Sequence, residues 1–188
     1  MSRFEDALRF AVEVHSGMTR RTEGIPYVLH PMEVATIAAS MTSNDDVLCA
    51  ALLHDVVEDT PTTMDEVRER FGERVAQLVA SETEDKRPEL PAAETWQVRK
   101  EESLDALRAS DDHDVHVLWL SDKLANMRSF ARLHERLGDA MWANFNQKDP
   151  RKQAWYYRSI AQALRDLSDT AAWREYDRLT EIVFRGVK

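Results

Sequence analysis

The sequence predicts a single all-α domain, a bundle of helices, and three observations favour that fold class. Only 5 glycines and 6 prolines occur in 188 residues, which leaves few of the turn residues that many short strands would need. Apolar residues recur at spacings of three and four, the period of an amphipathic helix. Several of these segments follow Ser, Thr, Asn or Asp, the residues that cap helix N-termini.

The first predicted helix covers residues 4–15, with Phe4 and Leu8 on its apolar face. His15 ends this helix just before a Ser-Gly pair. A cation is favourable at a helix C-terminus, so we expect His15 to cap this helix rather than to bind a metal.

Residues 19–31 are predicted to form a loop or a small hairpin, because the segment contains one glycine and two prolines. Pro31 can occupy the first turn of the next helix, at residues 32–41. This leaves His30 at the entrance of that helix, with its ring free to point into a cleft.

An apolar run then leads directly into His54 and Asp55, and Glu58 and Asp59 follow one helical turn later. On a continuous helix these four residues lie on neighbouring strips of one face. Ionisable groups close behind an apolar run normally pair, shift their pKa or bind a metal. Taken alone, the segment fits a metal site and a solvated acidic helix end equally well.

Capping residues, glycine and proline bound the remaining predicted helices. Asn44 or Asp45 is expected to cap the helix that carries His54, Thr62 or Thr63 the helix after it, and Asp111 or Asp112 the longest one. These helices cover residues 46–60, 63–71, 73–81, 96–109, 113–137, 150–167 and 170–184.

Residues 82–95 form the longest irregular segment, which is polar and twice interrupted by proline. A loop of this length is usually a lid or a flexible connector. Lys86 and Arg87 are basic residues in an acidic chain, and they favour the lid.

Charge and composition narrow the function classes. A formal net charge of −9 argues against a nucleic-acid or anionic-membrane surface, although one pocket can still bind a small phosphorylated ligand. No apolar run approaches the ~20 residues of a membrane span, and the N-terminus does not resemble a signal peptide. The single cysteine, Cys49, lies in an apolar run, so we expect a core residue in a protein of the reducing cytoplasm.

The candidate metal ligands come from three segments, and they are His30, His54, Asp55 and Asp122. Asp122 interrupts the apolar side of its predicted helix, so its carboxylate lies either at the surface or in a cleft. Two imidazoles and two carboxylates suit Mn, Fe, Zn or Mg, and disfavour metals that need thiolates. Such a site is suited to metal-assisted phosphoester hydrolysis, in which Glu58 and Asp59 can transfer protons.

The His54-Asp55 pair resembles the signature of the HD superfamily of metal-dependent phosphohydrolases. More narrowly, an ordered set of segments resembles the hydrolase domain of the RelA/SpoT proteins. These segments are Arg21 to Pro31, His54 to Thr60, Phe71-Gly72, Thr83 to Lys86, Ser121 to Arg128 and Trp155 to Arg158. Since no synthetase or regulatory domain follows, the resemblance is to a stand-alone small alarmone hydrolase.

This resemblance implies Mn²⁺-dependent hydrolysis of the 3′-pyrophosphate of guanosine tetra- or pentaphosphate, the alarmone of the stringent response, to GDP or GTP and pyrophosphate. The four candidate ligands would hold the manganese, and Glu58 and Asp59 would activate or position water. Arg21 would stack on the guanine. The remaining residues implied in the nucleotide and phosphate pocket are Lys86, Asn126, Lys152 and Tyr156.

Two departures from the family pattern leave alternatives open. Thr22 stands where Lys often follows the stacking Arg, and Ala125 stands where His is common. Because Thr22 lacks the positive charge of Lys, the affinity for phosphate and the choice between tetra- and pentaphosphate stay open. The alternatives are an HD phosphohydrolase of a dNTP, a nucleoside monophosphate or NADPH, and a non-catalytic module that binds the alarmone. Glu58 and Asp59 favour catalysis, because a binding module needs no proton transfer. The sequence leaves open whether the protein forms a homo-oligomer.

Overall fold

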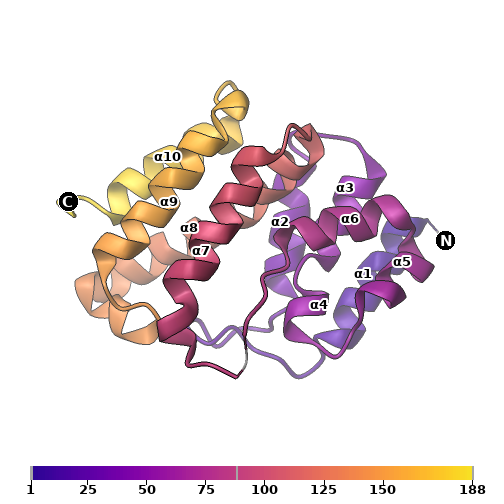
Figure 1. Cartoon of the computed structure of the whole chain (residues 1–188), viewed down its shortest axis with the longest axis horizontal. Helices are drawn as coiled ribbons and strands as arrows, with labels where there is room; N and C mark the ends of the chain where they lie inside the picture. Colours follow the sequence, from indigo (N-terminus) through magenta and orange to yellow (C-terminus); the bar gives the residue numbers. More distant parts are fainter. Residues whose placement is uncertain (1, 88, 188) are drawn as a thin grey trace.

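A computed structural model describes residues 2–87 and 89–187, and within them the chain is helical, with one isolated antiparallel bridge between Thr19 and Pro26. The all-α prediction is confirmed (Figure 1). The helices are α1 (Arg3–Val14), α2 (Leu29–Ala38), α3 (Asp45–Leu53), α4 (Val56–Asp59), α5 (Met64–Phe71), α6 (Glu73–Glu82), α7 (Ala92–Ala109), α8 (His113–Leu137), the 3₁₀ helix η1 (Gly138–Asn144), α9 (Pro150–Ala163), the 3₁₀ helix η2 (Arg165–Leu167) and α10 (Ala171–Val183).

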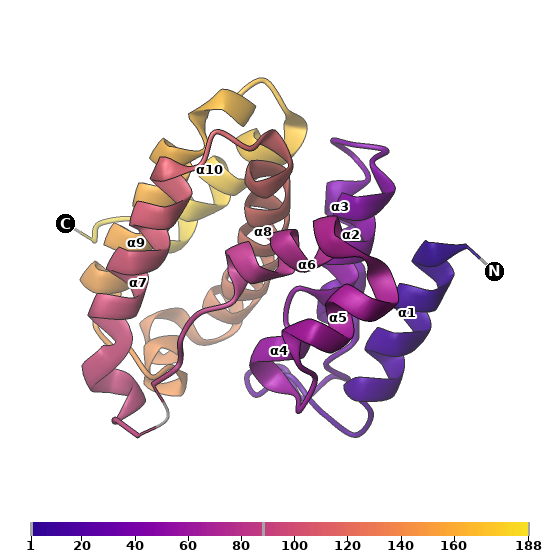
Figure 2. The same ribbon diagram turned by 45° about the vertical axis from the view of Figure 1, so that its right-hand side comes forward.

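Helix α8 joins two groups of helices. On one side it packs against α2, α3 and α6, and on the other against α10 and η1. Helices α7 and α9 pack against each other, and Figures 1 and 2 show them on the far side of α8 from α1 to α5. Residues in the middle of α8 can therefore contact both the N-terminal and the C-terminal half of the chain.

An aromatic cluster fixes the C-terminal helices on α8. The ring of Phe130, on α8, lies 5.9 Å from Trp142 of η1 and 5.2 Å from Tyr157 of α9. Phe184, at the end of α10, stacks on Trp142 at 5.4 Å. Aromatic pairs at these separations stabilise a fold beyond their area burial, so this cluster holds α9 and α10 in place.

The predicted capping residues stand at the helix starts. The side chains of Asn44, Thr63 and Asp112 accept hydrogen bonds from backbone amides in the first turns of α3, α5 and α8. His15 ends α1, and its Nδ1 bonds the carbonyl of Ala11 at 2.9 Å. The capping predictions at these four positions are confirmed.

The structure corrects the prediction of one continuous helix over residues 46–60. Helix α3 ends at Leu53, and α4 begins at Val56. The Nδ1–H of His54 donates to the carbonyl of Ala51 at 2.9 Å, which is the acceptor that the Asp55 amide would use in a continuous helix. The imidazole therefore competes with the backbone, and the helix breaks at the His-Asp pair.

Two other helix boundaries differ from the prediction. Helix α7 begins at Ala92, four residues earlier than expected, because Pro91 stands at its N-cap and good helix formers follow. The irregular segment is therefore shorter than predicted, and Pro88 within it lies outside the described residues. Helix α9 ends at Ala163 and the short η2 follows, so residues 150–167 do not form a single helix.

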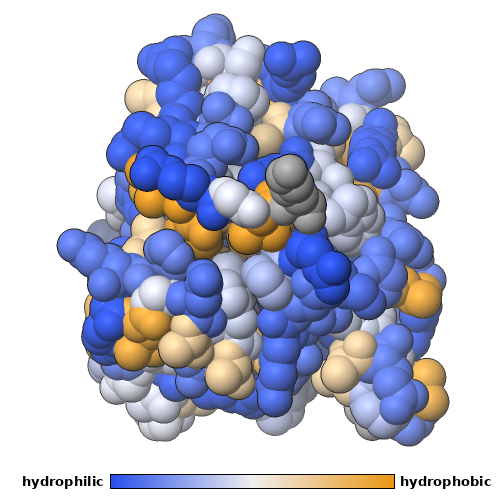
Figure 3. All heavy atoms as spheres, turned by 90° about the vertical axis from the view of Figure 1, so that its left-hand side faces the viewer, coloured by the Kyte–Doolittle hydropathy of each residue, from blue (hydrophilic) through white to orange (hydrophobic). Residues whose placement is uncertain are grey.

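Figure 3 shows one face, on which hydrophobic residues gather in small groups between hydrophilic ones. None of the helices in the described parts of the chain has the length and apolar character needed to cross a membrane. Cys49 is fully buried, and its burial raises the pKa of the thiol to about 11, as expected for a core residue and not for a nucleophile.

Candidate metal centre and substrate cleft

Two histidines and two aspartates converge where α2, the α3–α4 junction and α8 meet. His30 Nε2 lies 3.0 Å from Asp122 Oδ1 and 3.5 Å from Asp55 Oδ2. His54 Nε2 lies 3.1 Å from Asp55 Oδ2 and 3.5 Å from Asp122 Oδ1. The ligand atoms of His30, His54 and Asp122 all lie within 4.8 Å of one another. The structure thus brings together the four predicted ligands from three segments.

The local backbone explains this convergence. His30 lies in the first turn of α2, and His54 and Asp55 lie at the break between α3 and α4. On a continuous helix His54 and Asp55 would point about 100° apart, whereas the break lets both reach the same point. Asp122 lies in the middle of α8 and accepts a hydrogen bond from the side-chain amide of Asn126, one turn later, at 2.7 Å.

His54 is oriented as a metal ligand would be. Its Nδ1–H donates to the backbone, and its buried Nε2 makes no hydrogen bond within the described residues. Burial lowers the pKa of His30. Burial also opposes protonation of His54, but the carboxylates of Asp55 and Asp122 raise the pKa of its imidazole well above the usual value. Two carboxylates beside one imidazole nitrogen concentrate negative charge that a divalent cation would neutralise.

Tyr27 supports Asp55, and the sequence analysis assigned it no role. Its hydroxyl donates to Asp55 Oδ2 at 2.7 Å and also contacts Asp59 Oδ2. Burial and the two carboxylates raise the pKa of Tyr27, so the hydroxyl stays protonated and remains a donor. The ring stacks on His15, with 4.9 Å between ring centroids. The only signal in the sequence was the position of Tyr27 three residues before His30.

Glu58 and Asp59 lie on the short helix α4 beside the cluster, where Lys86 contacts both. The ammonium of Lys86 lies 2.5 Å from Asp59 Oδ1 and 3.3 Å from Glu58 Oε1. Burial, followed by the charge of Asp55, raises the pKa of Glu58. A carboxyl with a raised pKa next to a candidate metal centre has the properties of a general acid or base.

A second buried carboxylate, Glu82, reaches Asp122 through Lys123. The Lys123 ammonium lies 2.9 Å from Glu82 Oε2, contacts Asp122 Oδ2, and stands 4.6 Å above the ring of Trp119. Burial raises the pKa of Glu82 to about 7. Lys123 thus binds the Asp122 oxygen that faces away from the imidazoles, which orients the other oxygen toward them.

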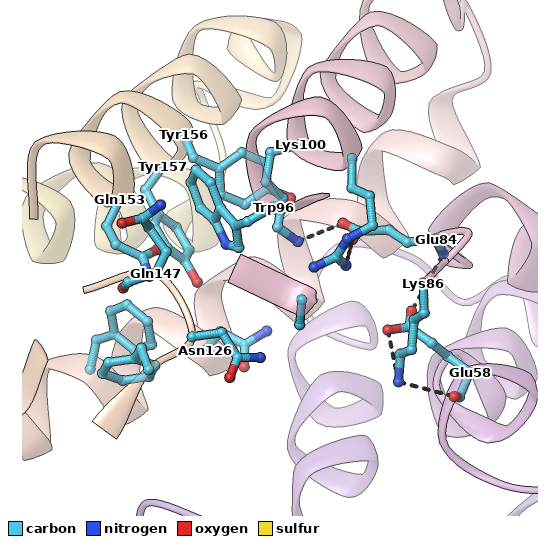
Figure 4. Close-up of a pocket in the computed structure, with 15 residues that line it drawn as sticks. Glu58, Glu84, Lys86, Trp96, Lys100, Asn126, Gln147, Gln153, Tyr156 and Tyr157 are labelled. Atoms are coloured by element: carbon cyan, nitrogen blue, oxygen red, sulfur yellow. Dashed lines mark hydrogen bonds and ion pairs between the residues drawn. The ribbon is translucent and has the colours of Figure 1, made fainter. Parts of the chain in front are cut away.

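The cluster lies at the end of a cleft with two connected compartments. The smaller one, of about 200 Å³, is lined by three of the candidate ligands, His30, Asp55 and Asp122, and the larger one, of about 440 Å³, is lined by aromatic rings that include Trp96, Phe130 and Tyr156. Four side chains line both compartments, which makes the cleft continuous. They are Glu58, Glu84, Lys100 and Asn126. Figure 4 shows these residues and the aromatic side chains around the larger compartment.

Three of the predicted nucleotide contacts line this cleft. Lys86 and Tyr156 line the larger compartment, and Asn126 lines both compartments. The hydroxyl of Tyr156 is buried and makes no hydrogen bond to any described residue. Lys152 is exposed in the first turn of α9 and lies outside the described lining of the cleft.

Arg21 is also exposed, and the structure brings its neighbour Arg20 into the cleft instead. The guanidinium of Arg20 donates to Asn126 Oδ1 at 3.0 Å and lies 5.8 Å from the ring of Tyr27. The hairpin decides this orientation, because Arg20 N–H bonds Ile25 O and the bridge pairs Thr19 with Pro26. Two adjacent arginines could not be distinguished without that register.

Comparison with known sequences gives a family match and several relatives. Residues 7–149 match the family model described as HD domain. The chain is 40% identical over 123 residues to a guanosine-3′,5′-bis(diphosphate) 3′-pyrophosphohydrolase of Aquifex aeolicus, a match covering 65% of this chain and 17% of the relative. It is 37% identical over 134 residues to the bifunctional (p)ppGpp synthase/hydrolase SpoT of Escherichia coli, covering 71% of this chain and 19% of that one. The matches thus span less than a fifth of these relatives.

Two solved structures match over most of their own length. One is described as a metazoan ortholog of SpoT that hydrolyzes ppGpp and plays a role in starvation responses. It has a TM-score of 0.76 and 25% identity, over 100% of this chain and 98% of that one. The other is a protein of Listeria monocytogenes, with a TM-score of 0.73 and 32% identity, over 86% of this chain and 99% of that one.

Proposed function

The chain belongs to the HD domain family, and we propose that it hydrolyses the 3′-pyrophosphate of guanosine tetra- or pentaphosphate, giving GDP or GTP and pyrophosphate. The observation that carries this proposal is the continuity between the His-Asp cluster and a compartment lined by aromatic rings. The names of the sequence relatives and the ppGpp hydrolysis ascribed to the metazoan structure support the same substrate.

The cluster fits a divalent cation. His54 Nε2 is a buried nitrogen without a hydrogen bond among the described residues, and Asp55 and Asp122 supply oxygen donors beside it. We propose Mn²⁺, which the family resemblance implies and which is one of the ions that a mixed nitrogen and oxygen donor set without thiolate suits. Held by His30, His54, Asp55 and Asp122, the ion would act as a Lewis acid on the phosphate and acidify water.

Carboxylate side chains of the protein would transfer the proton of the attacking water. We propose Glu58 and Asp59 as the catalytic pair, with Glu58 accepting the proton of the attacking water, since its raised pKa suits a group that both accepts and donates. Lys86 bridges the two carboxylates and would hold them in place. Tyr27, which donates to Asp55, would fix the orientation of that ligand.

The larger compartment would hold the guanosine. Aromatic rings such as Trp96 and Tyr156 offer faces and edges for the base, and the unpartnered Tyr156 hydroxyl offers a hydrogen bond. We propose Arg20 for the cationic contact that the family resemblance assigned to Arg21, because Arg20 lines the cleft. Asn126 links Arg20 to Asp122 and would position both. The roles of Arg21 and Lys152 stay predictions.

The test is pyrophosphate release from guanosine tetraphosphate by metal-stripped protein, with and without added Mn²⁺. We expect GDP and pyrophosphate in equal amounts, only when the ion is added. Parallel assays with a dNTP, a nucleoside monophosphate and NADPH at the same enzyme concentration test the substrate class. Faster turnover of a substrate without a 3′-phosphate would overturn the proposal, and tight binding of the alarmone without turnover would indicate a binding module.

A further inference from the structure

One cation lies at the boundary between the two compartments. Of the four described side chains that line both, only Lys100 carries a positive charge, while Glu58 and Glu84 are acidic and Asn126 is neutral. A substrate that reaches from the aromatic compartment to the metal cluster must pass this boundary. The charge of Lys100 is therefore available to the part of the substrate nearest the scissile bond.

The charges around Lys100 are not balanced. Its ammonium lies 2.5 Å from Glu84 Oε1, and the guanidinium of Arg99 lies 2.8 Å from Oε2 of the same carboxylate. One carboxylate thus serves two cations, which leaves one positive charge without a partner in the described residues. A buried uncompensated charge is costly, and an anion that entered the boundary would compensate it.

The other two lysines of the cleft, Lys86 and Lys123, each have more carboxylate neighbours than Lys100. Lys86 lies between Glu58 and Asp59, and Lys123 lies between Asp122 and Glu82. Each of these cations has two carboxylates. An incoming phosphate would find each of these two cations already paired with two carboxylates, whereas Lys100 shares its one carboxylate with Arg99.

Lys100 is also held in position before any ligand arrives. Its ammonium stands 4.8 Å from the ring centroid of Tyr156, and the hydroxyl of Ser103 shares Glu84 Oε1 with it. Figure 4 shows Lys100 beside Trp96 and Tyr156, directed toward Glu84. A cation fixed in this way loses little side-chain entropy on binding a phosphate.

We propose that Lys100 binds the 3′-pyrophosphate of the substrate and determines specificity for nucleotides that carry it. This inference rests on the proposed function and adds to it a residue for which the family resemblance gave no role. The 3′-pyrophosphate must reach the metal cluster. Among the described cations, Lys100 lines both the smaller compartment, which holds the cluster, and the larger aromatic compartment. The 5′-diphosphate would lie farther away, on the other side of the guanosine.

The experiment measures the binding of inorganic pyrophosphate and of GDP, the two products, to the Mn²⁺-loaded full chain by calorimetry. The variants are Lys100→Met, which keeps the length of the side chain, Lys100→Arg, which keeps its charge, and Lys148→Met. Lys148 is exposed and lies outside the described lining of the cleft, so this variant controls for the change in net charge.

We expect Lys100→Met to weaken pyrophosphate binding about tenfold to a hundredfold, as loss of a charge-assisted hydrogen bond does, and to leave GDP binding within about twofold. Lys100→Arg should retain most of the affinity, and Lys148→Met should match the wild type. The KM for guanosine tetraphosphate should rise in parallel in Lys100→Met. If this variant does not fold, as judged by circular dichroism, Lys100→Gln provides the same comparison.

Unchanged pyrophosphate binding in Lys100→Met would mean that the ion pair with Glu84 is only structural. Weaker GDP binding with unchanged pyrophosphate binding would assign Lys100 to the 5′-diphosphate. Either result overturns the inference, as would a wild-type protein that binds no pyrophosphate. Since binding needs no turnover, a protein that binds both products but does not cleave guanosine tetraphosphate would refute the proposed function and not the role of Lys100.

Discussion

The two ring nitrogens of His54 contact different groups. Nδ1 donates to the carbonyl of Ala51, which breaks the helix, and this bond leaves Nε2 directed at Asp55 and Asp122. One hydrogen bond therefore sets both the backbone and the tautomer of a candidate ligand. At the scale of residues, the centre depends on such supporting contacts as much as on the ligands themselves.

Substitution at Asp55 and at Glu58 should separate metal binding from chemistry. Asp55→Ala removes an oxygen donor from the cluster, so we expect loss of Mn²⁺ binding and of activity, each by at least about a hundredfold. Glu58→Gln leaves the donors in place, so it should keep the metal and lose mainly kcat. Metal content and steady-state kinetics test both. Full kcat in Glu58→Gln would exclude Glu58 as the proton acceptor.

Tyr27→Phe should weaken the metal site without unfolding the protein. The variant removes the donor to Asp55 Oδ2 and keeps the ring that stacks on His15. Loss of a group that orients a ligand typically costs about tenfold to a hundredfold in metal affinity, measured here by titration with Mn²⁺. Tyr176→Phe is the matched control, because that hydroxyl bonds the Tyr157 carbonyl. It should lower stability by about 1 kcal/mol and leave metal affinity unchanged.

At the scale of elements, the N-terminus of α8 is tied to α6. Arg74, on α6, donates two hydrogen bonds to Asp112, at 2.7 and 2.9 Å, and Asp112 also caps α8 by accepting from the amide of Asp114. These contacts lower the pKa of Asp112, the bonds from Arg74 being the largest cause. Because α8 carries Asp122, the hydrogen bonds between Arg74 and Asp112 also help to position a candidate metal ligand.

We expect Asp112→Asn to lower the free energy of unfolding at pH 7 by about 0.5–1 kcal/mol, a modest value because the pair is partly exposed. Asn is a good N-cap, so the variant isolates the charge. A depressed folded-state pKa stabilises the protein above the unfolded pKa of about 3.9, and this stability is lost as the pH falls through the folded value. The difference between wild type and variant, measured by urea unfolding, should therefore shrink below about pH 4.

A control variant for this prediction is Asp105→Asn, on the exposed face of α7. Its carboxylate pairs with Arg108 on the same helix, and we expect a change below about 0.5 kcal/mol. A difference for Asp112→Asn that stayed constant down to pH 3, or one that 1 M NaCl did not reduce, would contradict an electrostatic origin.

At the scale of the whole molecule, the candidate centre joins the two groups of helices. Two of the segments that carry ligands belong to the N-terminal group, and Asp122 lies on α8, which packs against α2 and α3 on one side and α10 on the other. An ion bound there would connect parts of the chain that separate on unfolding. Metal binding should therefore stabilise the entire fold.

The measurement is thermal unfolding with Mn²⁺ and with a chelator. An ion present at about 100 times its Kd stabilises the folded state by ~2.7 kcal/mol, which for a chain of this size corresponds to a Tm increase of about 5–10 °C. The chelator should reverse the increase, and Asp55→Ala should show none. An equal increase in Asp55→Ala would mean that the ion binds elsewhere.

The sequence by itself determined the fold class, most helix starts and the identity of the candidate ligands. Helical spacing and capping residues act within a few residues along the chain, so they can be read without tertiary contacts, as at Asn44, Thr63 and Asp112. The His-Asp pair and Asp122 stood out because ionisable groups interrupt apolar runs only where a partner or an ion compensates them.

Only the tertiary structure decided the break at His54, the position of Arg20 in the cleft and of Arg21 at the surface, and the contacts of Tyr27 and Lys100. The break depends on a side chain competing for a backbone carbonyl, and the arginine on the register of a hairpin. Lys100 differs from Lys86 and Lys123 in how many carboxylates surround it. Such differences arise from contacts between residues distant in sequence, which local patterns do not encode.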